Sequence, residues 1–568
     1  AGPPPASAIV VRSDERPDLS EITTVRLEQG GEARPEELPP ELPLGYHSIV
    51  GADGRKRALI VSPGACFTPP DLHVWGWGTQ LYALHSSESW GIGDLGDLRS
   101  LARWARSTGA GALLLNPLHA AQPGPHQQAS PYTPTSRRWR NPLYVRVEDV
   151  PGAERLEDLD EIVRAGRALN ESELIDRDAV YECKLGALER VWRARPPMDE
   201  FERWSAHQGG VLEDFATFVS LAEQFGPASA QWPGEYSHPR GPAVAQWRAG
   251  HADRIRFHEW VQWLLESQLA QAADEIGLIH DLAIGVDRQG ADAWIWGDVF
   301  APGMKVGAPP DEFNSLGQDW GLPPFDPWKL RTTDYEAFVE TIRSNLRVGA
   351  GLRIDHVMGL FRLFWIPDDA GPAEGTYVRY PHKELLDIVA LESHRATSLV
   401  VGEDLGTVEP FVREEMIVRN MLSYRIMWFE ESMPADYPEN ATAAIGNHDL
   451  QTVAGLWTGS DLAEQIGLNI APNVEATHAL RERLRERLGV TEESSIDEVM
   501  MRAHEHLAQA PSRILVATLE DACAQVPRTN QPGTTGDHRP NWSLRLPLSL
   551  EELGTHPRPA AIARTLSR

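Results

Sequence analysis

The chain has 568 residues, of which 42% are hydrophobic and 24% are charged, so it can bury a large core and is not wholly disordered. Acidic side chains outnumber basic ones by 82 to 53, which gives a formal net charge of −29. A field this acidic repels phosphate groups, which excludes nucleic acid and anionic membrane surfaces as expected partners. It does not oppose an uncharged partner, and the 19 tryptophans suggest a flat one.

Residues 1–70 contain short apolar alternations separated by turn-rich stretches, which predicts a small β-rich N-terminal module. The start of the chain has neither the basic region nor the long apolar stretch of a secretory signal, and no run approaches the roughly 18 apolar residues of a membrane span. We therefore expect a cytoplasmic protein. A first residue that is Ala rather than Met would fit a missing upstream segment.

The three cysteines are Cys66, Cys183 and Cys523. Their number is odd, their spacing is wide, and they form no CxxC pair. This pattern favours buried thiols in a reducing compartment over a disulfide framework or a structural zinc site. His504 and His506 lie two positions apart and face different sides of a helix, so they are not expected to bind a metal.

From residue 71 to residue 568, short apolar runs alternate with helical patterns, which is typical of βα units around a parallel sheet. Asp94 is the expected N-cap of the first helix, which Gly109 should end. A long, mainly helical insertion is expected from about 120 to 275. The predicted fold is an α/β protein, a (β/α)8 TIM barrel with its active site at the carboxyl ends of the strands. The eight strand candidates are Thr79–Leu84, Ala112–His119, Leu278–Val286, Gly351–Val357, Leu399–Asp404, Tyr424–Phe429, Ala443–Asp449 and Ile514–Leu519.

In three of these strand candidates an acidic residue stands where the apolar run stops: Asp355, Glu403 and Asp449. Burying an unpaired carboxylate costs several kcal/mol, so each must face a polar cleft or have a partner. Three such residues at one rim of a barrel indicate an active site.

The spacing of two of the acids suggests a reaction class. Asp355 and Glu403 end the predicted strands four and five, and neighbouring strands lie about 4.8 Å apart. Two carboxyl groups at matching heights would then be about 5 Å apart, which is the separation of a retaining glycosidase pair.

The surroundings of the acids suggest their roles. Arg353 precedes Asp355 by two positions and points to the same face of the strand, so it would keep Asp355 ionised, as suits a nucleophile. Glu403 follows Gly402 and two valines, and apolar surroundings would suit a general acid that later acts as a base. Asp449, with His448, would bind hydroxyl groups and stabilise the transition state.

At these residues the sequence resembles a known family. Three conserved regions of the α-amylase superfamily are similar to GLRIDHVMGLFRLFWIP, VGEDLG and GNHDLQT. The details are most similar to 4-α-glucanotransferases of glycoside hydrolase family 77, the amylomaltases or disproportionating enzymes. The resemblance extends over roughly residues 72 to 550 and includes the segments WGTQLYALHSSESWGIGDLGDL, SPYTPTSRRWRNPLYV, GAPPDEFNSLGQDWGLPP and EDACAQVPRTNQPGTTGDHRPNWSLRLP.

The resemblance implies a role for individual residues. Asp355 matches the nucleophile, Glu403 the general acid/base and Asp449 the transition-state stabiliser. The positions that match substrate-binding residues are Arg353, His356, His448, Asn447, Tyr132, Ser130 and Asp281, and, on an acceptor-site loop at about 305–325, Phe313, Gln318 and Trp320. Glu312 stands where some members have an aromatic residue, which leaves the acceptor preference open.

The implied activity is transfer of α-1,4-glucan segments from maltooligosaccharide or starch-like donors to glucose or maltodextrin acceptors, with no metal or organic cofactor. One alternative is an α-amylase-type retaining hydrolase, and another is a catalytically inactive glucan-binding protein. Residues 1–70 would be a sugar-binding module or, as we favour, a packing module. The tryptophans in or near the motifs, which could line the cleft, are Trp75, Trp77, Trp90, Trp139, Trp320 and Trp365; Trp104, Trp192, Trp260 and Trp263 are expected in the core.

Overall fold

The computed structural model describes residues 8–310, 317–470 and 472–567. The chain divides into two compact units, which are described separately. Unit 1 comprises Ala1–Asp71, Ile284–Arg288 and Trp296–Ser423, and unit 2 comprises Leu72–Ala283, Gln289–Ile295 and Tyr424–Arg568.

Eight strands form one parallel sheet in the order β16-β13-β10-β7-β6-β19-β18-β17, which confirms the predicted (β/α)8 barrel. The two strands at the ends of this order follow one another in the chain. Val401 of β16 bridges Leu422, which directly precedes β17, so the sheet closes on itself. The strands are β6 (Val74–Thr79), β7 (Ala112–Leu115), β10 (Gly277–Leu282), β13 (Gly351–Ile354), β16 (Leu399–Gly402), β17 (Ser423–Ile426), β18 (Ala441–Ala444) and β19 (Ile514–Thr518).

The first predicted strand, Thr79–Leu84, was placed too late in the chain. The strand is Val74–Thr79, and Leu81–Ala83 form a 3-10 helix. The strand sequence VWGWGT has two glycines, which weaken a strand signal. Gly76 is required by packing, because a Cβ at this position would lie 2.3 Å from the carbonyl oxygen of Ala112 on β7.

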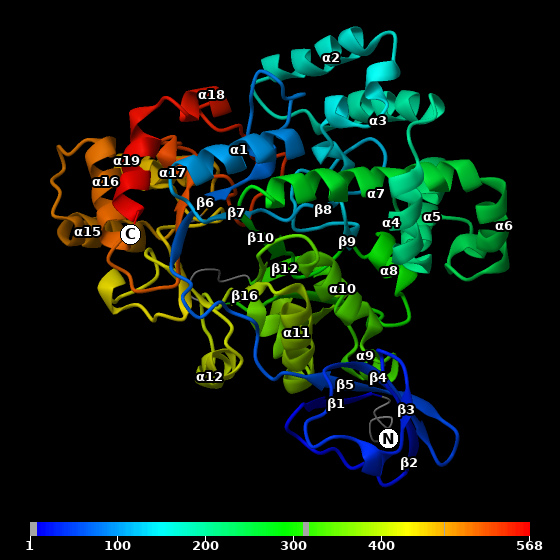
Figure 1. Ribbon diagram of the computed structural model, residues 1–568. Helices are drawn as coiled ribbons and strands as arrows, with labels where there is room; N and C mark the ends of the chain where they lie inside the picture. The colour runs from blue at the N-terminus through cyan, green and yellow to red at the C-terminus, as the bar shows by residue number, and fades with distance from the viewer. Residues whose placement is uncertain (1–7, 311–316, 471, 568) are drawn as a thin grey trace. The chain divides into compact units, whose positions relative to one another are not determined.

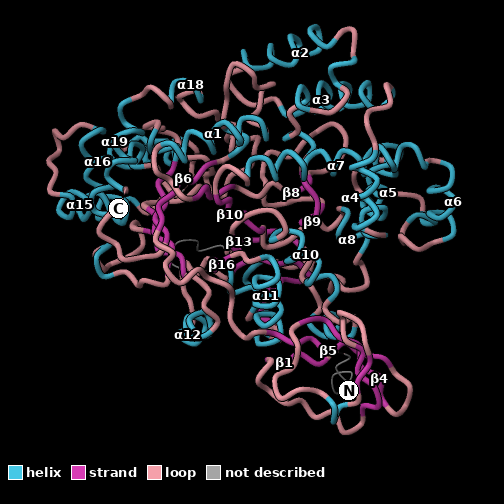
Figure 2. Tube along the Cα trace, in the orientation of Figure 1, coloured by secondary structure: helices cyan, strands magenta, loops and turns pink. Residues whose placement is uncertain are grey.

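The N-terminal segment of unit 1 forms a five-stranded sheet in the order β1-β5-β4-β2-β3, as the β-rich pattern predicted. Its core includes Val25, Ile49 and Leu59, which are almost completely buried. Helix α11 lies against β1 and β5 (Figures 1 and 2), and the Ser62 hydroxyl donates a 2.7 Å hydrogen bond to the Asp387 carbonyl on that helix. The strands are β1 (Ile9–Arg12), β2 (Ile22–Arg26), β3 (Glu32–Ala33), β4 (Gly45–Gly51) and β5 (Lys56–Ser62).

A four-stranded antiparallel sheet of unit 1 carries the predicted acceptor loop, in the order β12-β11-β14-β15. The loop enters along β11 (Met304–Ala308) and returns along β12 (Gln318–Leu322). The other strands are β14 (Arg362–Pro367) and β15 (Thr376–Arg379), and the helices of this unit are α9 (Pro327–Thr332), α10 (Glu336–Leu346), α11 (His382–Ala396) and α12 (Pro410–Val418).

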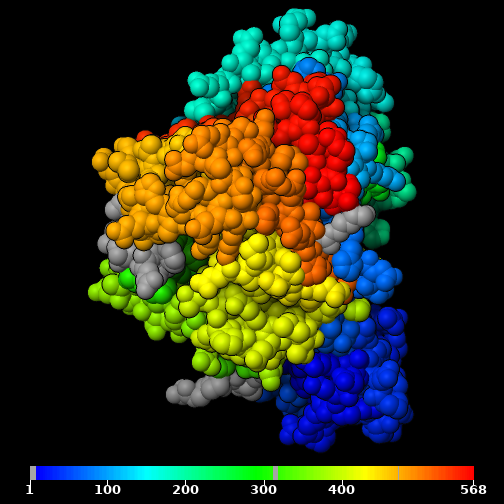
Figure 3. All heavy atoms as spheres, turned by 90° about the vertical axis from the view of Figure 1, so that its left-hand side faces the viewer, coloured from blue at the N-terminus to red at the C-terminus, as the bar shows by residue number. Residues whose placement is uncertain are grey.

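Unit 2 holds the predicted helical region between residues 120 and 275. Its longest helix, α7, packs beside the barrel helix α1, which Asp94 caps as predicted (Figure 1). Towards the C-terminus, α16 packs against α19, and Figure 3 shows this orange and red surface. The elements are β8 (His119–Ala120), β9 (Ser136–Arg140), α1 (Leu95–Ser107), α2 (Leu159–Ala168), α3 (Arg177–Arg193), α4 (Asp199–Gln208), α5 (Gly210–Phe225), α6 (Pro242–Gly250), α7 (Ala252–Ala273), α8 (Ala291–Ile295), α13 (Val453–Thr458), α14 (Ser460–Gly467), α15 (Val474–Leu488), α16 (Ile496–Leu507), α17 (Leu519–Ala522), α18 (Leu550–Leu553) and α19 (Pro557–Leu566). Across the described part of the chain, every helix is too short or too polar to span a membrane.

His504 is completely buried in α16, where its Nδ1 lies 2.8 Å from the Met500 carbonyl oxygen. Burial lowers the pKa of His504 from 6.5 to about 4. The folded state therefore holds a neutral imidazole at a pH at which the unfolded chain is protonated. The contribution of the buried neutral His504 to the free energy of unfolding is therefore fully present above pH 6.5 and is lost as the pH drops towards 4.

We expect His504→Leu to reduce this pH dependence. Between pH 7 and 4.5 the wild type should lose about 2 kcal/mol more unfolding free energy than the variant, at about 1.4 kcal/mol per pH unit. Urea unfolding at both pH values measures the difference, and His506→Leu is the matched exchange on the same helix. Equal pH slopes for the wild type and His504→Leu would contradict the assignment.

Candidate active site

Asp355 and Glu403 follow two strands of unit 1 that pair in register. Ile354 of β13 lies opposite Gly402 of β16, so the next residue on each strand is one of the acids. The Glu403 backbone N–H donates a 3.0 Å hydrogen bond to the Ile354 carbonyl, which continues the ladder to this point. The structure thus brings these two predicted residues to matching heights on neighbouring strands.

Arg353 contacts Asp355 as the spacing predicted. Its Nη1 donates a 3.2 Å hydrogen bond to Asp355 Oδ1, and the two side chains are 5% and 20% exposed. A guanidinium cannot lose its proton in this setting, so it supplies a fixed positive charge beside the carboxylate.

The Glu403 carboxylate is held by backbone hydrogen bonds, which the sequence did not suggest. Its two carboxylate oxygens accept backbone hydrogen bonds from His356, at 2.9 Å, and Leu405, at 2.8 Å. His356 also has a φ of +47°, an uncommon conformation for a residue other than glycine. Desolvation lowers the pKa of His356, so its imidazole is neutral at pH 7.

The acceptor-loop residues that the structure describes lie near this pair of strands. The Trp320 ring meets the His356 ring edge-on at 5.5 Å, and Trp320 Nε1 donates a 3.0 Å hydrogen bond to the Gln318 side chain. Phe313 and Glu312 lie outside the described residues.

A second group of predicted residues assembles in unit 2. The Tyr132 hydroxyl donates a 2.7 Å hydrogen bond to Asp281 at the end of β10, and it lies 3.4 Å from His448 Nδ1. The Tyr132 and His448 rings are 5.0 Å apart. Ser130 accepts a hydrogen bond from the Tyr132 backbone N–H through its hydroxyl. An aromatic face and several oxygen and nitrogen atoms are thus presented together, which suits an uncharged polyhydroxylated ligand.

Asp449 joins this second group from a turn, and not from the strand that was predicted to contain it. Strand β18 ends at Ala444, and the Asn447 side chain accepts a 3.0 Å hydrogen bond from the Asp449 backbone N–H. One Asp449 oxygen lies 3.3 Å from His448 Nε2.

Three residues of the C-terminal loop that the sequence motifs do not single out complete this group. The Trp542 ring lies 5.5 Å from Tyr132 and 5.3 Å from His448. The Asn530 side chain donates a 2.7 Å hydrogen bond to Asp449, and Arg528 Nη1 donates one of 3.2 Å to its backbone carbonyl. All three lie in the C-terminal segment that carries the family resemblance, which was the signal available for them.

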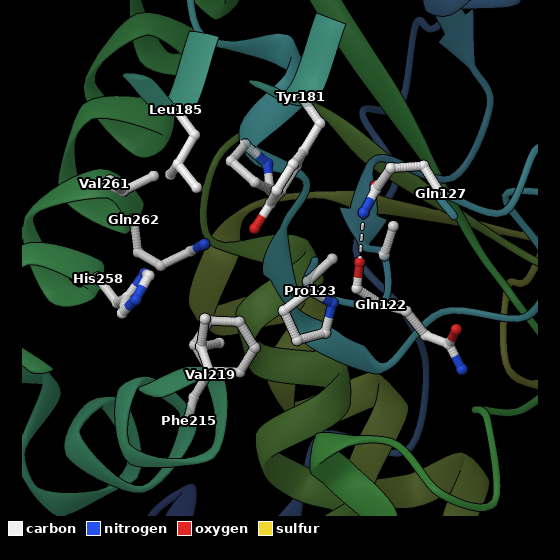
Figure 4. Close-up of a pocket in the computed structure, with 13 residues that line it drawn as sticks. Gln122, Pro123, Gln127, Tyr181, Leu185, Phe215, Val219, His258, Val261 and Gln262 are labelled. Carbon is white, nitrogen blue, oxygen red and sulfur yellow. Dashed lines mark hydrogen bonds between the residues drawn. The ribbon is translucent and has the colours of Figure 1, made fainter. Parts of the chain in front are cut away.

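A cavity lies beside the segment that leads to Ser130 and Tyr132 (Figure 4). The Tyr181 hydroxyl accepts a 3.1 Å hydrogen bond from the Gly124 backbone N–H, and the Gln127 side chain donates to the Gln122 and Gly124 carbonyls at 2.6 and 2.7 Å. These hydrogen bonds hold the segment that leads to Ser130 and Tyr132.

The closed parallel barrel, with acidic side chains after neighbouring strands, places the chain in the class of (β/α)8-barrel enzymes that act on glycosidic bonds. The sequence profile of glycoside hydrolase family 77, described as 4-alpha-glucanotransferase, matches residues 79–550. The chain belongs to this family, which makes it a glycosyl-transferring enzyme with 4-α-glucanotransferase activity.

Individual relatives agree with this assignment. The 4-alpha-glucanotransferase of Mycobacterium tuberculosis is 41% identical over 587 aligned positions, which cover 93% of this chain and 80% of that protein. The crystal structure of amylomaltase from Corynebacterium glutamicum matches with a TM-score of 0.88 at 31% identity and covers 99% of this chain and 90% of that one. The amylomaltase from Streptococcus agalactiae in complex with acarbose shares the fold, with a TM-score of 0.72 at 20% identity over 87% of this chain and 98% of that one.

Proposed function

We propose that the enzyme moves α-1,4-glucan segments between maltooligosaccharides by a retaining double displacement. In the first half-reaction Asp355 attacks the anomeric carbon while Glu403 protonates the leaving oxygen, and the reducing-end fragment departs. In the second, the 4-hydroxyl of another glucan gives its proton to Glu403 and attacks the covalent glucosyl-enzyme. Asp449 stabilises the oxocarbenium-like transition state, and the chemistry requires no metal or organic cofactor.

The observation that carries the proposal is the register of β13 and β16, which are directly followed by Asp355 and Glu403. Neighbouring strands are about 4.8 Å apart, a spacing close to the carboxyl separation of a retaining pair and shorter than that of an inverting pair, which accommodates a water. The fixed charge of Arg353 at 3.2 Å favours the ionised form that a nucleophile needs.

Substrate contacts follow from the two groups of residues. By the family resemblance, we assign Tyr132, Asp281, His448, Ser130 and Asn447 of unit 2, and Arg353 and His356 of unit 1, to substrate binding. We assign Gln318 and Trp320, and by the family resemblance Phe313, to binding of the acceptor, whose presence in place of water favours transfer in the second half-reaction.

We propose that the chain consists of a packing module, residues 1–70, and a catalytic barrel, residues 71–568. The contacts of the N-terminal sheet with α11, the helix before β16, support the packing role. A cytoplasmic location stays a prediction from the sequence.

The products from maltotriose test the activity. Transfer should give glucose and a ladder of maltodextrins longer than the substrate, resolved by chromatography over a time course. A hydrolase would give only glucose and maltose, and a glucan-binding protein would leave maltotriose unchanged; either result would refute the proposal. An Asp355→Asn preparation controls for contaminating activity.

A further inference from the structure

Helix α14 and the C-terminal loop are joined next to Asp449 by two arginine–carboxylate pairs. Arg528 donates two hydrogen bonds of 2.5 Å to the Asp461 carboxylate, and Arg539 pairs with Glu464 one turn further along α14. The Arg528 and Asp461 side chains are 7% and 3% exposed. A buried two-point contact of this kind fixes the orientation of the guanidinium plane.

The same guanidinium also holds the turn that carries Asp449. Arg528 donates to the Asp449 carbonyl at 3.2 Å and to the Gln451 side chain at 3.3 Å. Two residues later, the Asn530 backbone N–H donates to the His448 carbonyl at 3.1 Å, and its side chain donates to the Asp449 carboxylate at 2.7 Å. The loop therefore bonds both the backbone and the carboxylate of this turn.

We propose that Asp461 and Arg528 are positioning residues, which act through the C-terminal loop to set the place and orientation of Asp449. The inference rests on the proposed role of Asp449 in transition-state stabilisation. Such stabilisation depends on a preorganised geometry, and a misplacement of about 1 Å can cost about 100-fold in rate. A merely structural pair would affect folding but not the turnover of the folded enzyme.

The chain offers a matched comparison on one helix. Asp461 and Glu464 both accept hydrogen bonds from an arginine of the C-terminal loop, but only the partner of Asp461 contacts the Asp449 turn. We expect Asp461→Asn to lower kcat roughly 10- to 100-fold, with KM changed less than about threefold. Glu464→Gln should keep kcat within about threefold of the wild type. Thermal unfolding of both variants identifies the folded fraction on which kcat is calculated.

Arg528→Lys provides a second readout that does not require loss of charge. Lysine keeps the positive charge but cannot make the two-point contact. We therefore expect Arg528→Lys to have a melting temperature well above that of Arg528→Gln, but a kcat that is only slightly higher than that of Arg528→Gln.

The results separate this inference from the proposed function. If Asp449→Asn is inactive while folded Asp461→Asn and Arg528→Lys keep the wild-type kcat, the positioning role is refuted and the catalytic assignment stands. If Asp449→Asn itself remains active, the assignment of Asp449 fails, and the positioning role fails with it. A selective loss of kcat in Asp461→Asn, absent from Glu464→Gln, supports the inference.

Discussion

Asp355→Asn is expected to lower kcat for maltotriose disproportionation by at least about 10⁴-fold, a loss of about 5 kcal/mol in transition-state stabilisation. The amide of asparagine is a poor nucleophile, so no glucosyl-enzyme forms and both half-reactions stop. The shape of the side chain is kept, and its amide oxygen can still accept a hydrogen bond from Arg353. We therefore expect the fold to be retained, as circular dichroism and the melting temperature would record.

A matched exchange at Asp368 controls for the loss of an arginine-paired aspartate. Asp368 pairs with Arg288 at 2.8 Å, and its side chain is 40% exposed. Exposed pairs contribute about 0–1 kcal/mol, so Asp368→Asn should keep both stability and activity. If Asp355→Asn retained more than about 1% of the wild-type transfer activity, Asp355 would not be the nucleophile.

Intact-protein mass spectrometry with α-glucosyl fluoride distinguishes the two proposed acids. Fluoride leaves without protonation, so Glu403→Gln should still form the glucosyl-enzyme and accumulate it, because the base for the second half-reaction is missing. Asp355→Asn should gain no glucosyl mass. If Asp355→Asn gains the glucosyl mass, Asp355 is not the nucleophile. If Glu403→Gln never gains it, Glu403 is needed to form the glucosyl-enzyme from the fluoride, and its assignment as acid/base alone is wrong.

The barrel was predictable because most of its strands are buried apolar runs that differ clearly from the helices between them. The first strand was misplaced because its sequence, VWGWGT, is not an apolar run of this kind. Its position depends on the close packing of Gly76 against Ala112. The excess of tryptophan pointed to an uncharged, flat partner, but most of the tryptophans near the motifs have another role. Trp75, Trp77, Trp90 and Trp139 are at most 4% exposed and belong to the core.

Within the candidate site, residues whose partners are near in sequence were predictable and residues with distant partners were not. The contact of Arg353 with Asp355 follows from a spacing of two on a strand. The contacts of Asp449 with Arg528 and Asn530 span 79 and 81 positions, and no local pattern indicates which side chain will meet the turn. The hydrogen bonds to Glu403 were missed for a related reason, because they come from backbone N–H groups, which no side-chain pattern indicates.

Asp94 also has one contact that is local in sequence, its capping role, which was predicted. Its ion pairs with distant residues were not predicted. Its carboxylate is completely buried and accepts hydrogen bonds from Arg146 Nε at 2.9 Å and Lys184 Nζ at 3.1 Å. Lys184 also donates to the Leu143 and Val145 carbonyls, both at 2.8 Å. One carboxylate thus joins the barrel helix α1 to the helical insertion and to the end of the segment that carries Tyr132.

Asp94→Asn should therefore destabilise the protein by about 3–5 kcal/mol, because it leaves two buried cations without this partner. Burial opposes ionisation, but Lys184 and Arg146 outweigh it and keep the pKa of Asp94 below 3.8. A lowered carboxylate pKa contributes stability above the unfolded value, and this contribution is lost as the pH falls through the folded value. The difference between Asp94→Asn and wild type should be full at pH 7 and shrink below about pH 3.8.

Asp97 is the comparison for this exchange, since it is also buried, lies in the same turn and pairs with Arg146 at 2.8 Å, whereas Lys184 donates to Asp94. Burial and the charge of Asp94 raise the pKa of Asp97, so its negative charge is the more costly of the two to keep. Asp97→Asn should destabilise clearly less than Asp94→Asn in urea unfolding at pH 7. If the two exchanges cost the same, the two cations would not depend on Asp94 in particular, and the insertion would be held to α1 by packing.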